Sequence, residues 1–168
     1  MFVLGIDPGL SRCGYAAIST GEGHRLTMVA LGVLTTPVSS AVPSRLAELR
    51  TDLAALIAEL HPEVVVVEHV FFQSNRRTAM SVAQASGLAL AEAAAAGCVV
   101  VQYTSNEVKL ALCGYGAATK AQVGKLVQVR LGLAAPPKPA DAADAAALAI
   151  CHLTAAPLRA RVAAAVNR

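Results

Sequence analysis

Two short stretches of the chain contain only apolar residues. They span residues 2–6 and 64–67, and each is followed at once by a carboxylate, Asp7 after the first and Glu68 after the second. An uninterrupted apolar run of this length is typical of a strand that is buried on both faces of a sheet. We therefore expect two central strands that each end in an acid.

Three further strands and five helices complete the predicted fold. The strands cover residues 12–20, 25–35 and 98–102, with a hairpin turn at residues 21–23. The spacing of apolar residues and the flanking prolines predict helices at 43–60, 78–96, 105–112, 120–131 and from about 141 to 153. The order βββαβαβα, with small additional elements, predicts an α/β fold in which helices cover both faces of a five-stranded mixed sheet.

The length of 168 residues suits one domain with a sizeable core, so we expect residues 1–168 to form a single domain. The chain is 55% hydrophobic, but its longest uncharged stretch, residues 26–44, contains several Ser and Thr residues and is too polar to span a bilayer. The N-terminal sequence has an early acid, Asp7, and lacks a cationic region and a cleavage site. These features predict a cytoplasmic protein with no membrane partner.

The net positive charge of the chain is concentrated in residues 73–138. Residues 73–138 hold seven basic and two acidic residues, whereas the rest of the chain holds seven basic and nine acidic ones. A segment of this kind favours a polyanionic partner, although a solvated basic surface gives the same count.

Asp7 and Glu68 are candidates for a shared site. If their strands are parallel neighbours, the two carboxylates lie side by side at the carboxyl edge, where open α/β sheets keep their sites. Two anions so close to a core repel each other and lose hydration, so in the ionised form they need cations. The alternative for either residue alone is a strand-end acid that caps a nearby turn or helix.

Asp141 and Asp144 are three residues apart, which places them on one face of a helix. One alternative makes Asp141 the N-cap, with Asp144 reaching back as in a capping box. If instead Pro139 is the first helical residue, both acids lie inside the helix. The rest of the helix is nearly all apolar, so we expect it to pack on the sheet and to direct both acids to the edge with Asp7 and Glu68.

Four converging carboxylates suit hard divalent cations, above all Mg²⁺, with Mn²⁺ as a substitute of similar ligand preference. Two such ions, roughly 4 Å apart, can activate a water molecule and stabilise the leaving oxygen of a phosphodiester. The acids therefore predict a nuclease with two Mg²⁺ ions in each active site.

Four motifs resemble those of the RuvC family of Holliday-junction resolvases, namely GIDPGLSRCGYA, VVVVEHVFF, KAQV and PADAADAAALAICH. They occur in the right order over nearly the whole chain. The resemblance implies a ribonuclease-H-like fold and a homodimer that cuts two strands symmetrically across a four-way DNA junction, in recombination and repair. It implies that Asp7, Glu68, Asp141 and Asp144 are the catalytic metal ligands, although some relatives carry His at the position of Asp141. A branch-migration helicase partner follows from family analogy alone.

Phe71 and Phe72 follow Glu68 and precede a polar, basic stretch that includes Arg76 and Arg77. We expect one ring to pack inward and the other to stack on an unpaired base or act as a wedge. The resemblance gives this role to the position of Phe71, whereas Phe72 has no firm counterpart. Arg76 and Arg77 are candidates for contacts to the DNA backbone, with ordinary surface charge as the alternative.

Three lysines are further candidates for DNA binding. The resemblance places Lys109 and Lys120 near the scissile phosphate. Lys120 also begins a helix, where amide groups bind phosphate and where a lysine opposes the helix dipole, and Thr119 before it suits an N-cap. Lys125 is a candidate for a backbone contact.

The helix predicted at residues 78–96 is rich in small residues, which allow helices to approach closely. They are Ala79, Ser81, Ala83, Ala85, Ser86, Gly87 and Ala89. These residues either pack on the helix's own sheet or form a two-fold interface with a second copy. The resemblance favours the interface, because the family places its dimer contact on the matching helix.

Other functions are alternatives to the junction resolvase. A non-catalytic nucleic-acid-binding protein on the same fold usually lacks a carboxylate, whereas this chain has all four. A nuclease for other branched DNA or RNA shares every feature named above. An ATP-binding module of the actin-like or sugar-kinase type also opens with Gly-Ile-Asp-x-Gly, but needs two lobes and a much longer chain.

Overall fold

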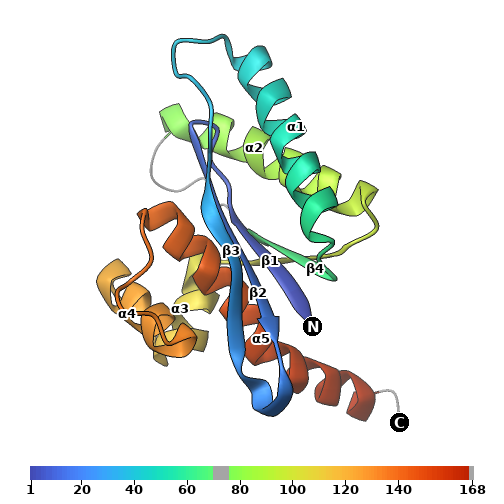
Figure 1. The fold of residues 1–168 in the computed structure, drawn as a ribbon, viewed down its shortest axis with the longest axis vertical. Coiled ribbons are helices and arrows are strands. Elements are labelled where there is room, and N and C mark those ends of the chain that lie inside the picture. Colours follow the sequence, from blue (N-terminus) through green and yellow to red (C-terminus); the bar gives the residue numbers. More distant parts are fainter. Residues whose placement is uncertain (70–75, 167–168) are drawn as a thin grey trace.

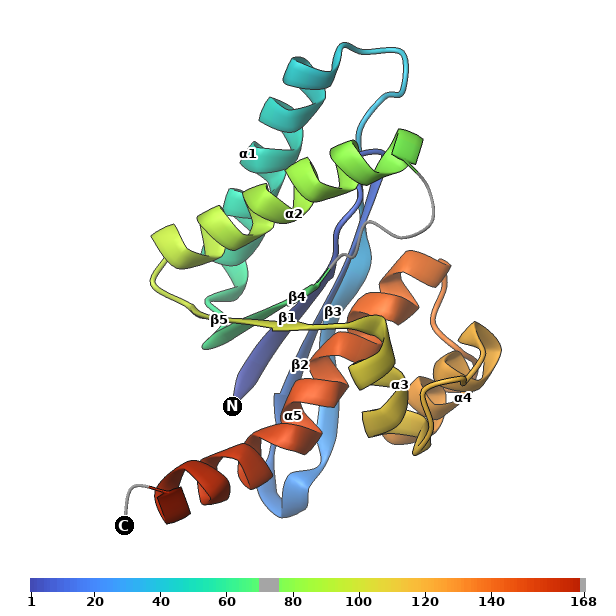
Figure 2. The same cartoon turned by 180° about the vertical axis from the view of Figure 1, so that it is seen from behind.

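The structure is a computed structural model that describes residues 1–69 and 76–166, without the side chains of residues 76–78 and 156–166. In chain order the elements are β1 (Phe2–Asp7), β2 (Arg12–Thr20), the 3₁₀ helix η1 (Glu22–His24), β3 (Leu26–Thr35), α1 (Val42–Leu60), β4 (Val64–Glu68), α2 (Arg76–Ala95), β5 (Val99–Tyr103), α3 (Ser105–Cys113), α4 (Lys120–Leu131) and α5 (Ala140–Val166). Helices α1 and α2 cover one face of the sheet, and α3, α4 and α5 lie on the other (Figures 1 and 2).

The five strands form one mixed sheet in the order β3-β2-β1-β4-β5. The central strand β1 pairs antiparallel with β2 and parallel with β4. In the parallel pair Ile6 lies opposite Val67, so Asp7 and Glu68 follow side by side. The prediction of a five-stranded mixed sheet with helices on both faces is confirmed.

Alternation along the central strands divides the core into two layers. Val3 and Val66 belong to the layer with α5, whereas Leu4 and Val65 belong to the layer with α1 and α2. Successive side chains of a strand point to opposite faces. Two-residue steps from Val3 to Asp7 and from Val66 to Glu68 therefore direct both carboxylates toward the α5 face.

Two glycines let α5 lie directly on the sheet. A Cβ atom at Gly5 would overlap the carbonyl oxygen of Ala145, and one at Gly14 would overlap the carbonyl oxygen of Asp141. The facing positions of α5 are alanines, among them Ala142 and Ala149, which are fully buried. Helix backbone thus rests on strand backbone, and the first turn of α5 is held at the edge that carries Asp7.

Helix α5 is longer than predicted. The expectation that it ends near Leu153 is wrong, because the helix continues past Pro157 to Val166. Proline removes one amide donor from a helix, but the Ala-rich sequence on both sides has a high helix propensity. Figures 1 and 2 show the C-terminal part of α5 extending beyond the strands. The other boundaries agree with the predictions to within two residues, and those predicted at 12–20 and 120–131 agree at both ends.

Among the helices of the described ranges, none combines the length and the apolar character that crossing a membrane requires.

The substitution Gly5→Ala tests the contact between α5 and β1. Its methyl group would collide with the Ala145 carbonyl and displace the helix, so we expect the free energy of unfolding in urea to fall by about 1–3 kcal/mol. Gly21→Ala is the control, because no described atom lies within 4 Å of its Cβ position. Equal unfolding free energies for the two variants would contradict the close packing of α5.

Candidate active site

Three of the four predicted carboxylates line one cavity at the carboxyl edge of β1 and β4. Asp7 and Glu68 come from the ends of these strands, and Asp144 comes from the beginning of α5. The cavity has a volume of about 140 Å³, and its wall also contains Ser105, Val108, Lys109, Lys120, Val123, Ala147 and Leu148. The sheet edge and α5 therefore bring together acids that are up to 137 residues apart in the sequence.

The carboxylates of this cavity destabilise one another's charged forms. Burial raises the pKa of Asp7 to about 8, and the charges of Glu68 and Asp144 and a hydrogen bond to Glu68 add to the rise. Burial also raises the pKa of Glu68, against the hydrogen bond from Asp7 and the charges of Lys120 and Lys109. Without a bound cation, burial and mutual repulsion therefore favour a proton shared between Asp7 and Glu68.

Lys120 supplies a positive charge to the same cavity. Its Nζ atom donates to Oδ2 of Asp144 at 2.7 Å, and this hydrogen bond raises the pKa of the Lys120 ammonium group. Lys120 is the first residue of α4, and Thr119 is the N-cap, with a capping box that includes Gln122. The predicted N-cap is confirmed, and it aims the first residue of α4 at Asp144.

Asp141 lies one turn before Asp144 but does not line the cavity. Its Oδ2 atom accepts a hydrogen bond from Nε of Arg12 at 2.8 Å. Helix α5 begins at Ala140, and the carbonyl of Pro139 accepts the first amide hydrogen bonds of the helix. The capping-box alternative is therefore wrong, and Asp141 lies within the first turn.

Arg12 is the site residue that sequence reasoning missed. It begins β2, and Gly14 and Ala16 follow on the same face of that strand, the face against which α5 packs. Two-residue spacing from Gly14 was the available signal. This spacing alone does not indicate a site residue, because the sequence does not show that β2 contacts the first turn of α5.

The donor set of the cavity fits a hard divalent cation. Its oxygen ligands come from three carboxylates whose charged forms are disfavoured in the absence of a positive charge. The cavity is roughly ten times the 10–15 Å³ that one water molecule needs, so it has room for ions that keep several waters. Within residues 1–69 and 76–166, no three acidic, His or Cys side chains are grouped closely enough to hold one ion as they stand. Instead, Lys120 forms an ion pair with Asp144, and Arg12 forms an ion pair with Asp141.

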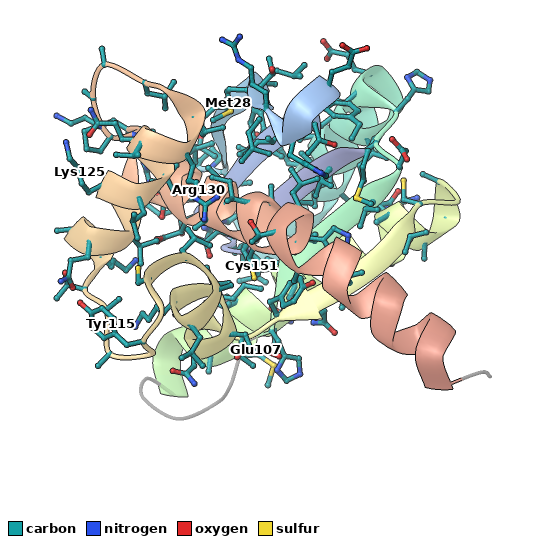
Figure 3. All side chains as sticks on the ribbon, turned by 90° about the horizontal axis from the view of Figure 1, so that it is seen from below. Met28, Glu107, Tyr115, Lys125, Arg130 and Cys151 are labelled. Carbon is teal, nitrogen blue, oxygen red and sulfur yellow. The ribbon has the colours of Figure 1, made fainter. Side chains whose placement is uncertain are left out.

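The predicted DNA-binding residues are distributed unevenly around this cavity. Lys109 and Lys120 line it. Lys125 lies at the outer edge of α4 (Figure 3), where its Nζ atom donates to Oε1 of Gln128 at 3.0 Å. Arg76 and Arg77 form the first turn of α2, without described side chains. Phe71 and Phe72 lie outside the described residues.

The small residues of α2 face two directions. Ala85, Ser86 and Ala89 are buried, and the two alanines belong to the core between α2, α1 and the sheet. Gly87 is exposed, and no described atom lies within 4 Å of its Cβ position. Ala85 and Ala89 therefore pack on the molecule's own sheet and α1. The outward face of α2 contains Gly87 and the largely exposed Met80.

Comparisons with known proteins agree over most of the chain. A family model described as "Crossover junction endodeoxyribonuclease RuvC" matches residues 3–152. A protein with the same description from Salinispora arenicola (strain CNS-205) is 49% identical over 168 residues, covering 100% of this chain and 96% of that protein. The solved structure of Thermus thermophilus RuvC aligns with a TM-score of 0.87 at 32% identity, over 94% of this chain and 96% of that one. The T. thermophilus RuvC in complex with Holliday junction substrate aligns with a TM-score of 0.85 at 29% identity, with the same coverage.

The raised pKa of Asp7 predicts how the stability of the metal-free protein depends on pH. The pKa of Asp7 is 3.8 in the unfolded chain and is raised to about 8 in the folded protein. Between these values the folded state binds more protons than the unfolded chain, and the raised pKa of Glu68 acts in the same direction. The free energy of unfolding therefore falls as the pH rises through this window and levels off above it. We expect the thermal midpoint to decrease from about pH 5 to about pH 8, and Asp7→Asn to remove most of that decrease. A variant midpoint that falls as steeply as the wild-type midpoint would contradict this assignment.

Proposed function

The chain belongs to the RuvC family of crossover junction endodeoxyribonucleases, and from this premise we propose that it resolves four-way DNA junctions by paired, symmetric hydrolysis of two phosphodiesters. The observation that carries the proposal is the cavity at the carboxyl edge, where Asp7, Glu68 and Asp144 meet two lysines. Its position on a ribonuclease-H-like fold supports the assignment, as does the structural match to a relative in complex with Holliday junction substrate.

We propose that two Mg²⁺ ions are held by Asp7, Glu68, Asp141 and Asp144, with Mn²⁺ as a substitute. Bound divalent ions supply an activated water and neutralise the charge of the leaving oxygen. The chain's own contribution is the arrangement of oxygen ligands. Strand ends hold Asp7 and Glu68 rigidly beside each other, and one turn of α5 places Asp144 opposite them. Asp7 must lose the proton that it shares with Glu68 before it can act as a ligand.

The two lysines of the cavity bind the phosphate that is cut. Lys120 is 78% exposed, so its ammonium group can turn from Asp144 to a phosphate oxygen. Lys109 on α3 faces the same cavity. Phosphate contacts fix the register of the strand over the carboxylates without reading its sequence. We propose that Lys125, Arg76 and Arg77 make further contacts to the DNA backbone.

The aromatic pair distinguishes a junction from a continuous duplex. We assign Phe71 the stacking role at an unpaired base, with Phe72 as its neighbour. Both residues follow, in the sequence, the strand that ends in Glu68. An opened junction offers unstacked bases next to the scissile phosphate, whereas a regular duplex does not.

Symmetric cutting requires two copies of the site. One chain has one set of carboxylates and can nick one strand, so paired nicks follow from a two-fold homodimer. We place the dimer contact on the outward face of α2, which includes Met80 and Gly87. We also propose that residues 1–168 act as one domain in the cytoplasm, with a branch-migration helicase complex as a further partner.

Asp7→Asn tests the catalytic assignment. The variant keeps the size of the side chain but loses the ionisable ligand, so we expect cleavage of a synthetic four-way junction with Mg²⁺ to fall by at least about a thousandfold, a loss typical of removing an essential catalytic group. Junction binding should remain, because Asp7 does not contact DNA in this scheme. Asp52→Asn on α1 is the matched control and should cut like the wild type. Wild-type cutting by the Asp7 variant would refute the site.

Substrate choice separates the resolvase from its two alternatives. Junction, flap, duplex and RNA–DNA hybrid should be compared at equal protein concentration. Equal cutting of flaps and junctions would favour a broader branched-DNA nuclease. Binding without cutting of any of them, across Mg²⁺ and Mn²⁺, would favour a non-catalytic binding protein.

Gly87→Glu tests the proposed dimer contact. A charged side chain on the outward face of α2 would be desolvated and repelled by its two-fold copy, so we expect a monomer in sedimentation experiments and unpaired nicks in place of paired ones. Gly21→Glu introduces the same charge at an open position in the hairpin and should remain dimeric. A dimeric Gly87 variant with paired cutting would place the contact elsewhere.

A further inference from the structure

Arg12 and Asp141 form an ion pair that the proposed reaction does not use. Their atoms Nε and Oδ2 are 2.8 Å apart, although the residues are 129 positions apart in the chain. The side chains are 49% and 32% exposed, respectively. The pair lies beside the carboxylate cavity and occupies the one proposed metal ligand that does not line it.

A partly buried hydrogen-bond network with α1 anchors the backbone just before Arg12. Arg45 on α1 is 8% exposed, and it donates from Nε to Thr36 at 3.0 Å and from Nη2 to Ser11 at 2.6 Å. Thr36 in turn donates to the carbonyl of Leu10 at 2.5 Å. Residues 10 and 11 immediately precede Arg12. The backbone is therefore anchored, while the guanidinium group of Arg12 remains half exposed.

The backbone of Asp141 is anchored by its contact with β2. Its carbonyl group rests on Gly14, two residues after Arg12 on the same face of β2. Neither backbone can move away from the other without separating α5 from the sheet. The contact can change only by rotation of the two side chains.

An ion pair at this level of exposure is weak and exchangeable. Water screens its charges, and such pairs contribute little to stability. A divalent ion with carboxylate ligands has twice the charge of a guanidinium group and takes oxygen ligands directly. Asp141 can therefore exchange Arg12 for an ion at small cost, and the half-exposed side chain of Arg12 can then turn to solvent.

We propose that Arg12 is the counter-ion of Asp141 until a divalent ion replaces it, and that the released guanidinium group then binds the DNA backbone. The proposal rests on the proposed function in that Asp141 is taken as a metal ligand. It couples the two binding events, because a bound ion makes a phosphate-binding group available and a bound phosphate leaves Asp141 free for the ion. Such coupling is reciprocal.

The first half is tested by titrating Mn²⁺ into DNA-free protein in a calorimeter. Arg12→Gln removes the competitor, so we expect Mn²⁺ to bind about two- to fivefold more tightly, in line with the loss of a surface ion pair. Arg50→Gln is the matched control. Arg50 on α1 forms an ion pair of similar geometry with Glu92 on α2, at 2.7 Å, on the opposite face of the sheet from α5. The control should bind Mn²⁺ like the wild type.

A double-mutant cycle separates the contact from the general effect of charge. In an Asp141→Asn background, Arg12→Gln should leave Mn²⁺ affinity unchanged, since its partner is already neutral. Wild-type Mn²⁺ affinity of the Arg12→Gln single variant overturns the proposal. So does a tightening that persists in the Asp141→Asn background. Arg12→Lys keeps the charge with a single donor group and should lie between the wild type and Arg12→Gln, which provides a second variant if the glutamine variant folds poorly.

The second half is tested by the salt dependence of junction binding, with Ca²⁺ in place of Mg²⁺. One phosphate contact changes the slope of log affinity against log salt by about 0.9. We expect the slopes of wild type and Arg12→Gln to differ by about this amount with Ca²⁺ and to coincide with EDTA, where Arg12 stays on Asp141. Equal slope differences in both buffers would overturn the release of Arg12. Neither test depends on cleavage, so its outcome is independent of the Asp7→Asn experiment.

Discussion

The close contact of α5 with β1 and β2 is the constraint on which the site depends. Gly5 and Gly14 have no side chains, so the carbonyl groups of Ala145 and Asp141 rest directly on the strands. This contact sets how far α5 lies above the sheet and which turn faces the edge. Asp144 meets Asp7 across the cavity only because the two backbones approach this closely.

The same packing creates electrostatic repulsion among the carboxylates of the candidate active site. Burial against α5 removes water from Asp7 and Glu68 and raises the pKa of both carboxyl groups. Protonation of Asp7 relieves part of the repulsion, and Lys120 neutralises Asp144. The acids of this cavity are thus built on strand ends and a helix, and their charged forms are disfavoured without a cation. Stability of the metal-free protein and readiness to bind metal oppose each other here.

Cationic side chains belong to this arrangement as much as the acids do. Lys120 reaches the cavity because Thr119 caps α4 and starts the helix opposite Asp144. Arg12 reaches Asp141 because β2 runs beside β1 and under the first turn of α5. Both are exposed enough to exchange a carboxylate for a phosphate. The acids are thus already in contact with the groups that we propose to bind the DNA backbone.

The sequence alone predicted most element boundaries and three acids that line the cavity. The apolar runs that end in Asp7 and Glu68 identify two central strands, because a strand that is buried on both faces of a sheet has apolar residues at every position. Thr119 identified the start of α4, because capping is a local interaction. Tertiary structure decided what local patterns leave open. It placed Asp141 inside α5 rather than at its cap, it turned Ala85 and Ala89 of α2 toward the core, and it joined Arg12 to Asp141. Each of these depends on which surfaces meet, and contacts between residues far apart in the chain leave no periodic signal in either segment.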